Sequence, residues 1–159
     1  MSKVYTIDGR NIYDLGSFLK EFAKSVNAPN NYFGNDLLGF DDCLFTSSFG
    51  LEAPCKIIWK NSVLSKQRLN CKMLKRYYEE EKIMYEKELV KEMKELFEHG
   101  RTEATEEECF SYDRIKYSSY MIEKAVNCKM DLFDEIVHII QTVTERSGNK
   151  DWIIELILK

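Results

Sequence analysis

Two adjacent aspartates, Asp41 and Asp42, are the residues of this sequence best placed for a chemical role. They lie in residues 25–55, a segment without Lys, Arg or His that also holds Asp36 and Glu52. The formal charge of this segment is -4, equal to that of the whole chain, so the other residues sum to about zero. Such a segment can be a solvated helix face. It can also be an anionic surface that mates with a basic cleft, speeds encounter by steering and mimics phosphates.

An enzymatic role is the alternative for these side chains. Asp41, Asp42, Cys43 and His138 could form a hydrolytic site, but no spacing brings His138 near Cys43, and no nucleophile motif is present. We therefore expect no catalysis. The chain has 5 cysteines, none in a C-x-x-C pair, and 2 histidines, so we expect free thiols, no metal site and no cofactor.

Size and charge narrow the function classes further. A chain of 159 residues has the usual size of one domain, and 44% hydrophobic residues are enough for a core without metal or disulfide. The net charge of -4 argues against a general nucleic-acid binder, since phosphates require clustered Lys and Arg. Residues 1–9 contain no apolar signal core, and no stretch approaches the ~20 apolar residues of a membrane span. We expect a cytoplasmic protein that does not bind membranes.

The elements that must position the acidic segment begin with three apolar runs, predicted as strands at Val4–Ile7, Lys56–Lys60 and Trp152–Leu158. The last run is almost continuously apolar, which predicts a strand buried on both faces inside a parallel sheet. Helical patterns separate the runs, so we expect an α/β fold with right-handed parallel crossovers.

Three helices are expected around this sheet. Asp14 is a plausible N-cap for the first, and the apolar stripe within residues 133–143 predicts the last. Asn35 or Asp36 can cap the second, which runs to about Phe45. Its inward stripe leaves at least one of the paired aspartates facing water, because neighbouring helical residues point about 100° apart. That stripe consists of Leu37, Phe40 and Leu44.

The long middle section is highly charged. Residues 72–99 alternate acids and bases around a thin apolar stripe, which predicts a solvated helix packed by one edge and ended by Gly100. A coiled-coil arm is the alternative, although the EEEK run at residues 79–82 interrupts any heptad pattern. Thr105 begins a T-E-E-E sequence that predicts a capping box and a further helix. We therefore expect a single domain, residues 1–159, with a helical insertion at about 63–130.

A resemblance to a known family rests on residues 32–44, which read YFGNDLLGFDDCL. This segment resembles the barstar family of ribonuclease inhibitors, whose pattern is roughly aromatic-aromatic-Gly-x-Asn-Leu-Asp-Ala-Leu-x-Asp-Cys-Leu. Residues 5–9, 57–62 and 131–158 support the resemblance. It implies a barstar-like three-stranded parallel sheet with packed helices, and the middle section resembles an insertion of helices that some barstar-related proteins carry.

The resemblance also implies a site, in which the second helix and the loop before it plug a ribonuclease active site. Tyr32 matches the family's contact tyrosine, Gly34 its tight-turn glycine, and Asp42 the aspartate that occupies the enzyme's phosphate site. This chain departs from the pattern at Leu38, which stands where the family has a contact aspartate. The segment keeps its negative charge, in a different arrangement, because two other positions gain a carboxylate. Asp36 replaces an asparagine, and Asp41 replaces an aromatic residue.

We therefore expect an immunity-type inhibitor whose protein partner is a basic ribonuclease or similar toxin enzyme, without direct nucleic-acid binding. The alternative is a non-inhibitory regulatory or scaffold protein that binds a partner through the inserted helices. The expected partner-binding residues are Tyr32, Phe33, Gly34, Asp36, Leu38, Asp41, Asp42 and Phe45.

Overall fold

The computed structural model describes residues 2–101 and 103–159. The chain divides into two compact units. The sheet unit contains the residues up to Asn70 together with Leu132–Lys159, and the helical unit is Cys71–Asp131. No helix among the described residues is both long enough and apolar enough to cross a membrane.

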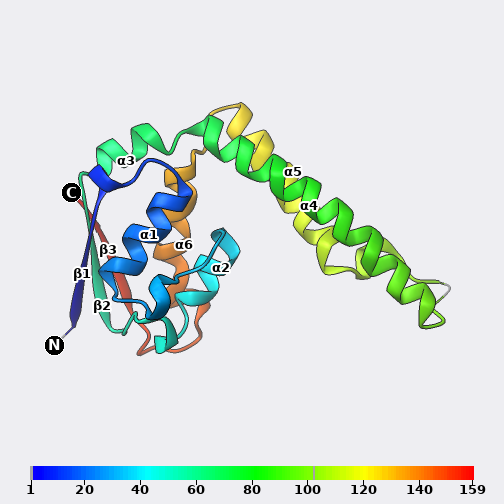
Figure 1. Cartoon of the computed structure of the whole chain (residues 1–159), viewed down its shortest axis with the longest axis horizontal. Coiled ribbons are helices and arrows are strands. Elements are labelled where there is room, and N and C mark those ends of the chain that lie inside the picture. Colours follow the sequence, from blue (N-terminus) through cyan, green and yellow to red (C-terminus); the bar gives the residue numbers. More distant parts are fainter. Residues whose placement is uncertain (1, 102) are drawn as a thin grey trace. The chain divides into compact units, whose positions relative to one another are not determined.

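The sheet unit is built on three parallel strands in the order β1-β2-β3: Lys3–Asp8, Cys55–Lys60 and Ile154–Leu158 (Figure 1). This confirms the predicted parallel α/β sheet. The register aligns Tyr5 with Ile57 and Leu156. Along β2, Cys55, Ile57 and Trp59 are buried while the alternate residues are more exposed, which is the pattern of a strand with one covered face.

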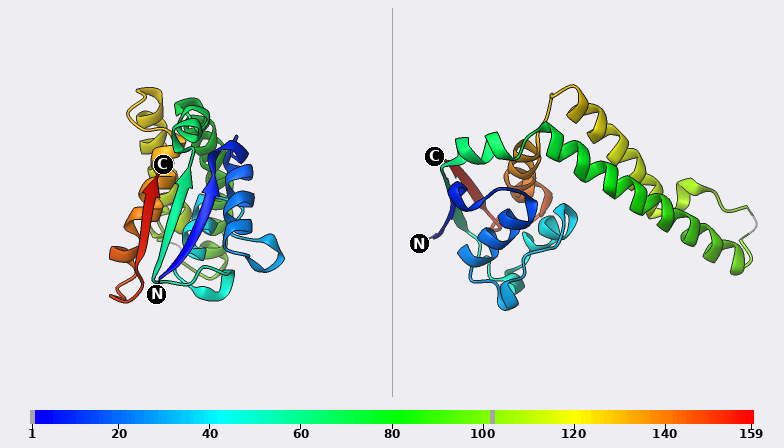
Figure 2. Two further views of the ribbon diagram at one scale, coloured as in Figure 1. Left: turned by 90° about the vertical axis from the view of Figure 1, so that its left-hand side faces the viewer. Right: turned by 45° about the horizontal axis from the view of Figure 1, so that its top comes forward.

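The prediction for the terminal strand was wrong in its burial. β3 lies at an edge of the sheet, and within it Ile154 is buried whereas Leu158 is 42% exposed. The physical reason is that the helices of this unit lie behind one face of the sheet (Figure 2, left). Trp152 precedes the strand, and its indole Nε1 donates to the carbonyl oxygen of Leu44 at 2.8 Å.

Four α-helices belong to the sheet unit: α1 (Leu15–Ser25), α2 (Leu37–Cys43), α3 (Ser62–Arg68) and α6 (Leu132–Arg146). Short 3-10 turns occur at Gly9–Asn11, Pro29–Asn31 and Ser47–Phe49. The predicted N-cap Asp14 is confirmed, since it forms a capping box with Ser17. Helices α1, α2 and α6 cover the sheet over a core of aromatic rings, in which Phe18 lies 5.3 Å from Trp59 and Trp59 lies 4.9 Å from Phe133.

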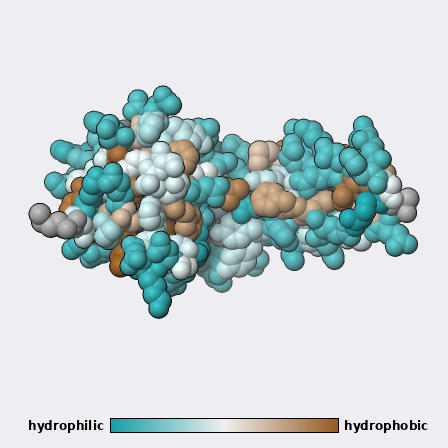
Figure 3. All heavy atoms as spheres, turned by 90° about the horizontal axis from the view of Figure 1, so that it is seen from below, coloured by the Kyte–Doolittle hydropathy of each residue, from teal (hydrophilic) through white to brown (hydrophobic). Residues whose placement is uncertain are grey.

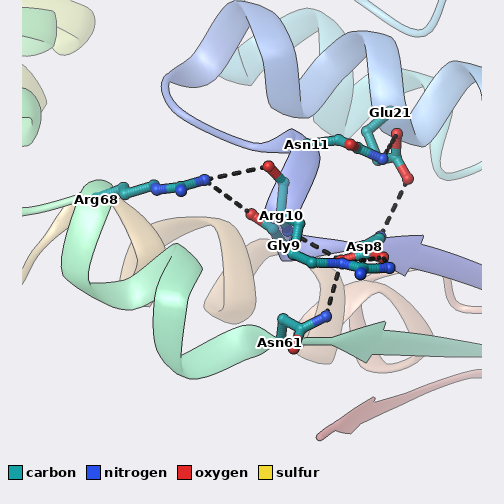
Figure 4. A network of polar contacts seen from close by, with 7 residues as sticks. All are labelled: Asp8, Gly9, Arg10, Asn11, Glu21, Asn61 and Arg68. Carbon is teal, nitrogen blue, oxygen red and sulfur yellow. Dashed lines mark hydrogen bonds and ion pairs between the residues drawn. The ribbon is translucent and has the colours of Figure 1, made fainter.

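A polar network joins the carboxyl ends of β1 and β2 to α3 (Figure 4). The Asp8 carboxylate accepts hydrogen bonds from the Arg10 guanidinium at 2.7 Å and from the Asn61 amide at 2.9 Å. The hydrogen bonds from Arg10, with that from Asn61, hold the pKa of Asp8 well below its usual range. The Arg68 guanidinium donates hydrogen bonds to three backbone carbonyl oxygens in the turn that follows β1, those of Gly9, Arg10 and Ile12.

The helical unit is a hairpin of α4 (Cys71–Glu98) and α5 (Phe110–Val126), which run side by side in opposite directions (Figures 1 and 2). Its packing includes a polar contact, in which the Ser111 hydroxyl donates to Glu92 Oε1 at 2.6 Å. The predicted capping box at Thr105 was wrong: its side chain makes no cap hydrogen bond, and Glu106–Glu108 form a 3-10 turn before α5. Three consecutive acids fit the positive amino end of a helix without requiring a box.

Candidate partner-binding surface

The loop before α2 is fixed by two glycines. Gly34 has a φ of +89°, and a Cβ there would lie 2.4 Å from the backbone nitrogen of Phe40. A Cβ on Gly39 would lie 3.4 Å from the Gly34 Cα, so the loop and the first turn of α2 approach closely. Asp36 is the N-cap, and its Oδ1 accepts from the Gly39 N–H at 2.7 Å. One oxygen of this predicted contact residue therefore holds the start of the helix.

The rings beneath the loop are core residues. Phe33 is 1% exposed, and its ring lies 4.7 Å from Phe22 and 5.7 Å from Phe40. The sequence analysis grouped Phe33 with the partner-binding residues because it lies in the family motif. The structure instead places its side chain inside the unit, where it supports the loop backbone from below.

Tyr32 and Asp42 are the exposed side chains of the predicted set. Tyr32 is 39% exposed, and its ring lies 5.9 Å from that of Phe49. Asp42 is exposed on α2, and its carboxylate makes no hydrogen bond or ion pair with the described residues. Leu38, one turn earlier on the helix, is half-buried. The surface thus offers a free carboxylate, a phenol ring and an aliphatic side chain.

Asp41 is held by an arginine from the far end of the chain. The Arg146 guanidinium makes two hydrogen bonds to its carboxylate, at 2.8 and 2.7 Å, and lies 5.1 Å from the centre of the Phe45 ring. The same guanidinium donates to the Thr142 hydroxyl and the Ile139 carbonyl on α6. Asp41 is therefore a paired charge, and its part in partner binding stays a prediction. The sequence analysis missed Arg146, which is separated from Asp41 by 105 positions and has no motif around it.

The arrangement argues against nucleophilic chemistry at Cys43. The thiol is only 2% exposed, and burial together with the neighbouring Asp42 charge raises its pKa. His138 lies on the solvent-exposed side of α6. Within the described residues, no three His, Cys, Asp or Glu side chains are grouped so as to hold a metal ion.

The helical unit has a separate surface feature, a shallow apolar groove between α4 and the turn before α5. Its lining consists of the apolar residues Leu89, Val90, Met93 and Phe97 and the charged residues Lys94, Glu98 and Glu106. On the face that Figure 3 shows, hydrophobic residues of this unit lie among hydrophilic ones. This groove is the feature to which the alternative reading, binding through the inserted helices, would apply.

Comparison with known proteins bears on these two surfaces. The family model described as barstar (barnase inhibitor) matches residues 2–92. The match includes β1, α1, α2, β2, α3 and most of α4, and thus every predicted partner-binding residue, but not Arg146. No curated protein and no solved structure matches the chain. Because the family match extends over more than half of its 159 residues, the chain belongs to the barstar family.

Proposed function

We propose that this protein inhibits a basic ribonuclease, or a similar basic toxin enzyme, by inserting α2 and the loop before it into the active site. The observation that supports this most directly is Asp42, a free and exposed carboxylate within the family match. The resemblance of its motif matches it to the family's phosphate-site aspartate. A carboxylate that becomes desolvated against Arg or Lys gives strong, slowly dissociating contacts.

The neighbours of Asp42 define the shape of the expected cleft. Tyr32 provides an aromatic anchor on one side, and Leu38 supplies apolar contact where the family pattern has an aspartate. Asp36 contributes mainly by holding the helix start. A fitting enzyme therefore has a cationic phosphate site opposite Asp42 and an uncharged wall opposite Leu38.

A barnase-type ribonuclease is the first enzyme to test, by inhibition of RNA cleavage and by binding kinetics. We expect inhibition by the wild type, and we expect Asp42→Ala to raise Kd by roughly 30-fold or more, mainly through faster dissociation. Asp113→Ala, at an exposed aspartate of α5, removes the same charge from the helical unit and should change Kd less than about twofold. Equal effects of the two substitutions would refute this role for Asp42.

The Asp41–Arg146 pair should control the rate of encounter. Arg146→Ala removes a positive charge and frees the Asp41 carboxylate at the rim of the surface. For a basic partner we expect association to become faster, by about two- to fivefold at low salt, and the gain to shrink as salt is added. Slower association in this variant would show that Arg146 itself contacts the enzyme favourably.

A further inference from the structure

The five cysteines are all free thiols, but they differ in access. Cys43, Cys55 and Cys109 are buried, and burial raises the pKa of Cys55 to about 11. Cys71 is half-buried, and Cys128 is exposed. Only these last two combine solvent access with a neighbouring thiol, because they lie at the same end of the paired helices α4 and α5 and a side-chain hydrogen bond with Cys128 raises the pKa of Cys71.

The pair sits where the two helices of the helical unit meet at one end. Cys71 is the first residue of α4, and Cys128 follows the last residue of α5, Val126, by two positions. Cys128 has a φ of +48°, and its N–H donates to the Ala125 carbonyl at 3.0 Å. This capping turn fixes the backbone of Cys128, and the start of α4 fixes that of Cys71, so neither thiol depends on a loose loop for its position.

We propose that Cys71 and Cys128 form a reversible disulfide site. When a peroxide or an oxidised low-molecular-weight thiol is present, the disulfide links the start of α4 to the turn that follows α5. The bond would link the two ends of a segment that contains all of α4 and α5. It would limit the conformational freedom of the unfolded segment and so stabilise the hairpin.

The two thiols supply the two electrons that reduce one peroxide molecule. The exposed Cys128 thiolate attacks one peroxide oxygen, the O–O bond breaks, and a sulfenic acid and hydroxide result. The hydroxide becomes water by taking up the proton that the Cys128 thiol released when the thiolate formed. Cys71 then attacks the Cys128 sulfur, and the sulfenic oxygen leaves as a second water with the Cys71 proton. Two thiols are oxidised to one disulfide, and one peroxide is reduced to two waters. The hydrogen bond to Cys128, with burial, raises the pKa of Cys71, which suits the resolving thiol better than the attacking one.

The test uses the full chain, reduced, freed of reductant and then treated with hydrogen peroxide or with oxidised glutathione. Thiol titration in denaturant should fall from five to three, and should return to five after dithiothreitol. Trypsin cleaves on both sides of each cysteine, so mass spectrometry should find residues 69–72 linked to residues 125–129. The thermal midpoint of the helical unit, followed by circular dichroism, should rise by at least about 5 °C.

Two variants make the test specific. Cys71→Ser should abolish the linked peptide, whereas Cys109→Ser, at a buried thiol of the same unit, should retain it. The linked peptide is first sought in the wild-type protein, so that result does not depend on whether either variant folds well. Retention of five thiols after oxidation, a lasting glutathione adduct at Cys128, or a disulfide-linked dimer would each overturn the proposal.

Discussion

The two units of this protein are stabilised by different kinds of packing. In the sheet unit, fully buried rings contact one another in a continuous chain: Phe22 touches Phe18, Phe33 and Phe40, and Phe18 stacks on Trp59. In the helical unit, α4 buries side chains only along its first half, the last of them at Tyr85. Beyond it, residues 86–98 are half-buried or exposed.

This difference shows where a precise surface can be built. Asp42 lies on the same short helix as Phe40, whose ring is completely buried, so the aromatic core determines the direction in which the carboxylate points. The distal half of α4 depends more on local helix formation and on edge contacts. A rigid contact surface is thus expected from the sheet unit, and a more adaptable one from the helical unit.

Deleting a core ring should produce the largest contrast. Phe22→Ala removes a fully buried side chain that contacts three other rings, and should lower the free energy of unfolding by about 3–5 kcal/mol. Leu89→Ala, at a half-buried position of α4, should cost about 1 kcal/mol. Both tryptophans, Trp59 and Trp152, are in the sheet unit, so urea unfolding followed by tryptophan fluorescence isolates the first effect, and circular dichroism reports the second. Similar costs would contradict the contrast in packing.

Two glycines provide the next contrast, because both have positive φ but only one is enclosed. A Cβ at Gly34 would meet backbone atoms of Phe40 and Gly39 at 2.4 and 2.7 Å, whereas one at Gly100 would meet nothing within 4 Å. We expect Gly34→Ala to cost about 3 kcal/mol and to weaken enzyme binding. Gly100→Ala should cost about 1 kcal/mol and leave binding unchanged. Equal losses of stability would mean that the loop before α2 can move away from the helix.

The sequence could predict features that are encoded locally. Three parallel strands follow from apolar runs separated by helical patterns, and the caps at Asp14 and Asp36 follow from short polar side chains just before such patterns. The edge position of β3 did not follow, since a continuous apolar run does not reveal how many faces of a sheet are covered. The Asp41–Arg146 pair did not follow either, because it joins distant segments without a motif.

The polar network at Asp8 should have a smaller effect that depends on pH. Folding lowers the pKa of Asp8, so its stabilisation is present above the unfolded value, near 3.8, and is lost as the pH falls through the lower folded value. The carboxylate is close to solvent, which limits the cost of Asp8→Asn to about 1 kcal/mol at pH 7. The difference from wild type should therefore shrink below about pH 4, as measured by urea unfolding at several pH values.

The matched substitution in the helical unit is Glu79→Gln. It removes an exposed ion pair with Lys75, 3.4 Å long and one helical turn apart, and should cost only about 0.3 kcal/mol. A cost as large as that of Asp8→Asn would show that the charges of α4 act as a network rather than as separate pairs.

Removing the helical unit should have the smallest effect on the sheet unit. The Phe133 N–H donates to the Leu69 carbonyl at 3.1 Å, so the chain ends left by excising Cys71–Asp131 are close enough for a short Gly-Ser linker. No ring of the aromatic core is lost, and closing a shorter loop changes the entropy only logarithmically. Tryptophan fluorescence should therefore show cooperative unfolding, with a free energy within about 1 kcal/mol of that of the full chain.

We propose on this basis that the protein is a barstar-like domain with a helical insertion. We expect the shortened protein to retain its affinity for the ribonuclease within about twofold. Loss of cooperative unfolding would show that the hairpin completes the core. Retained folding with lost binding would instead favour a partner that docks on the inserted helices.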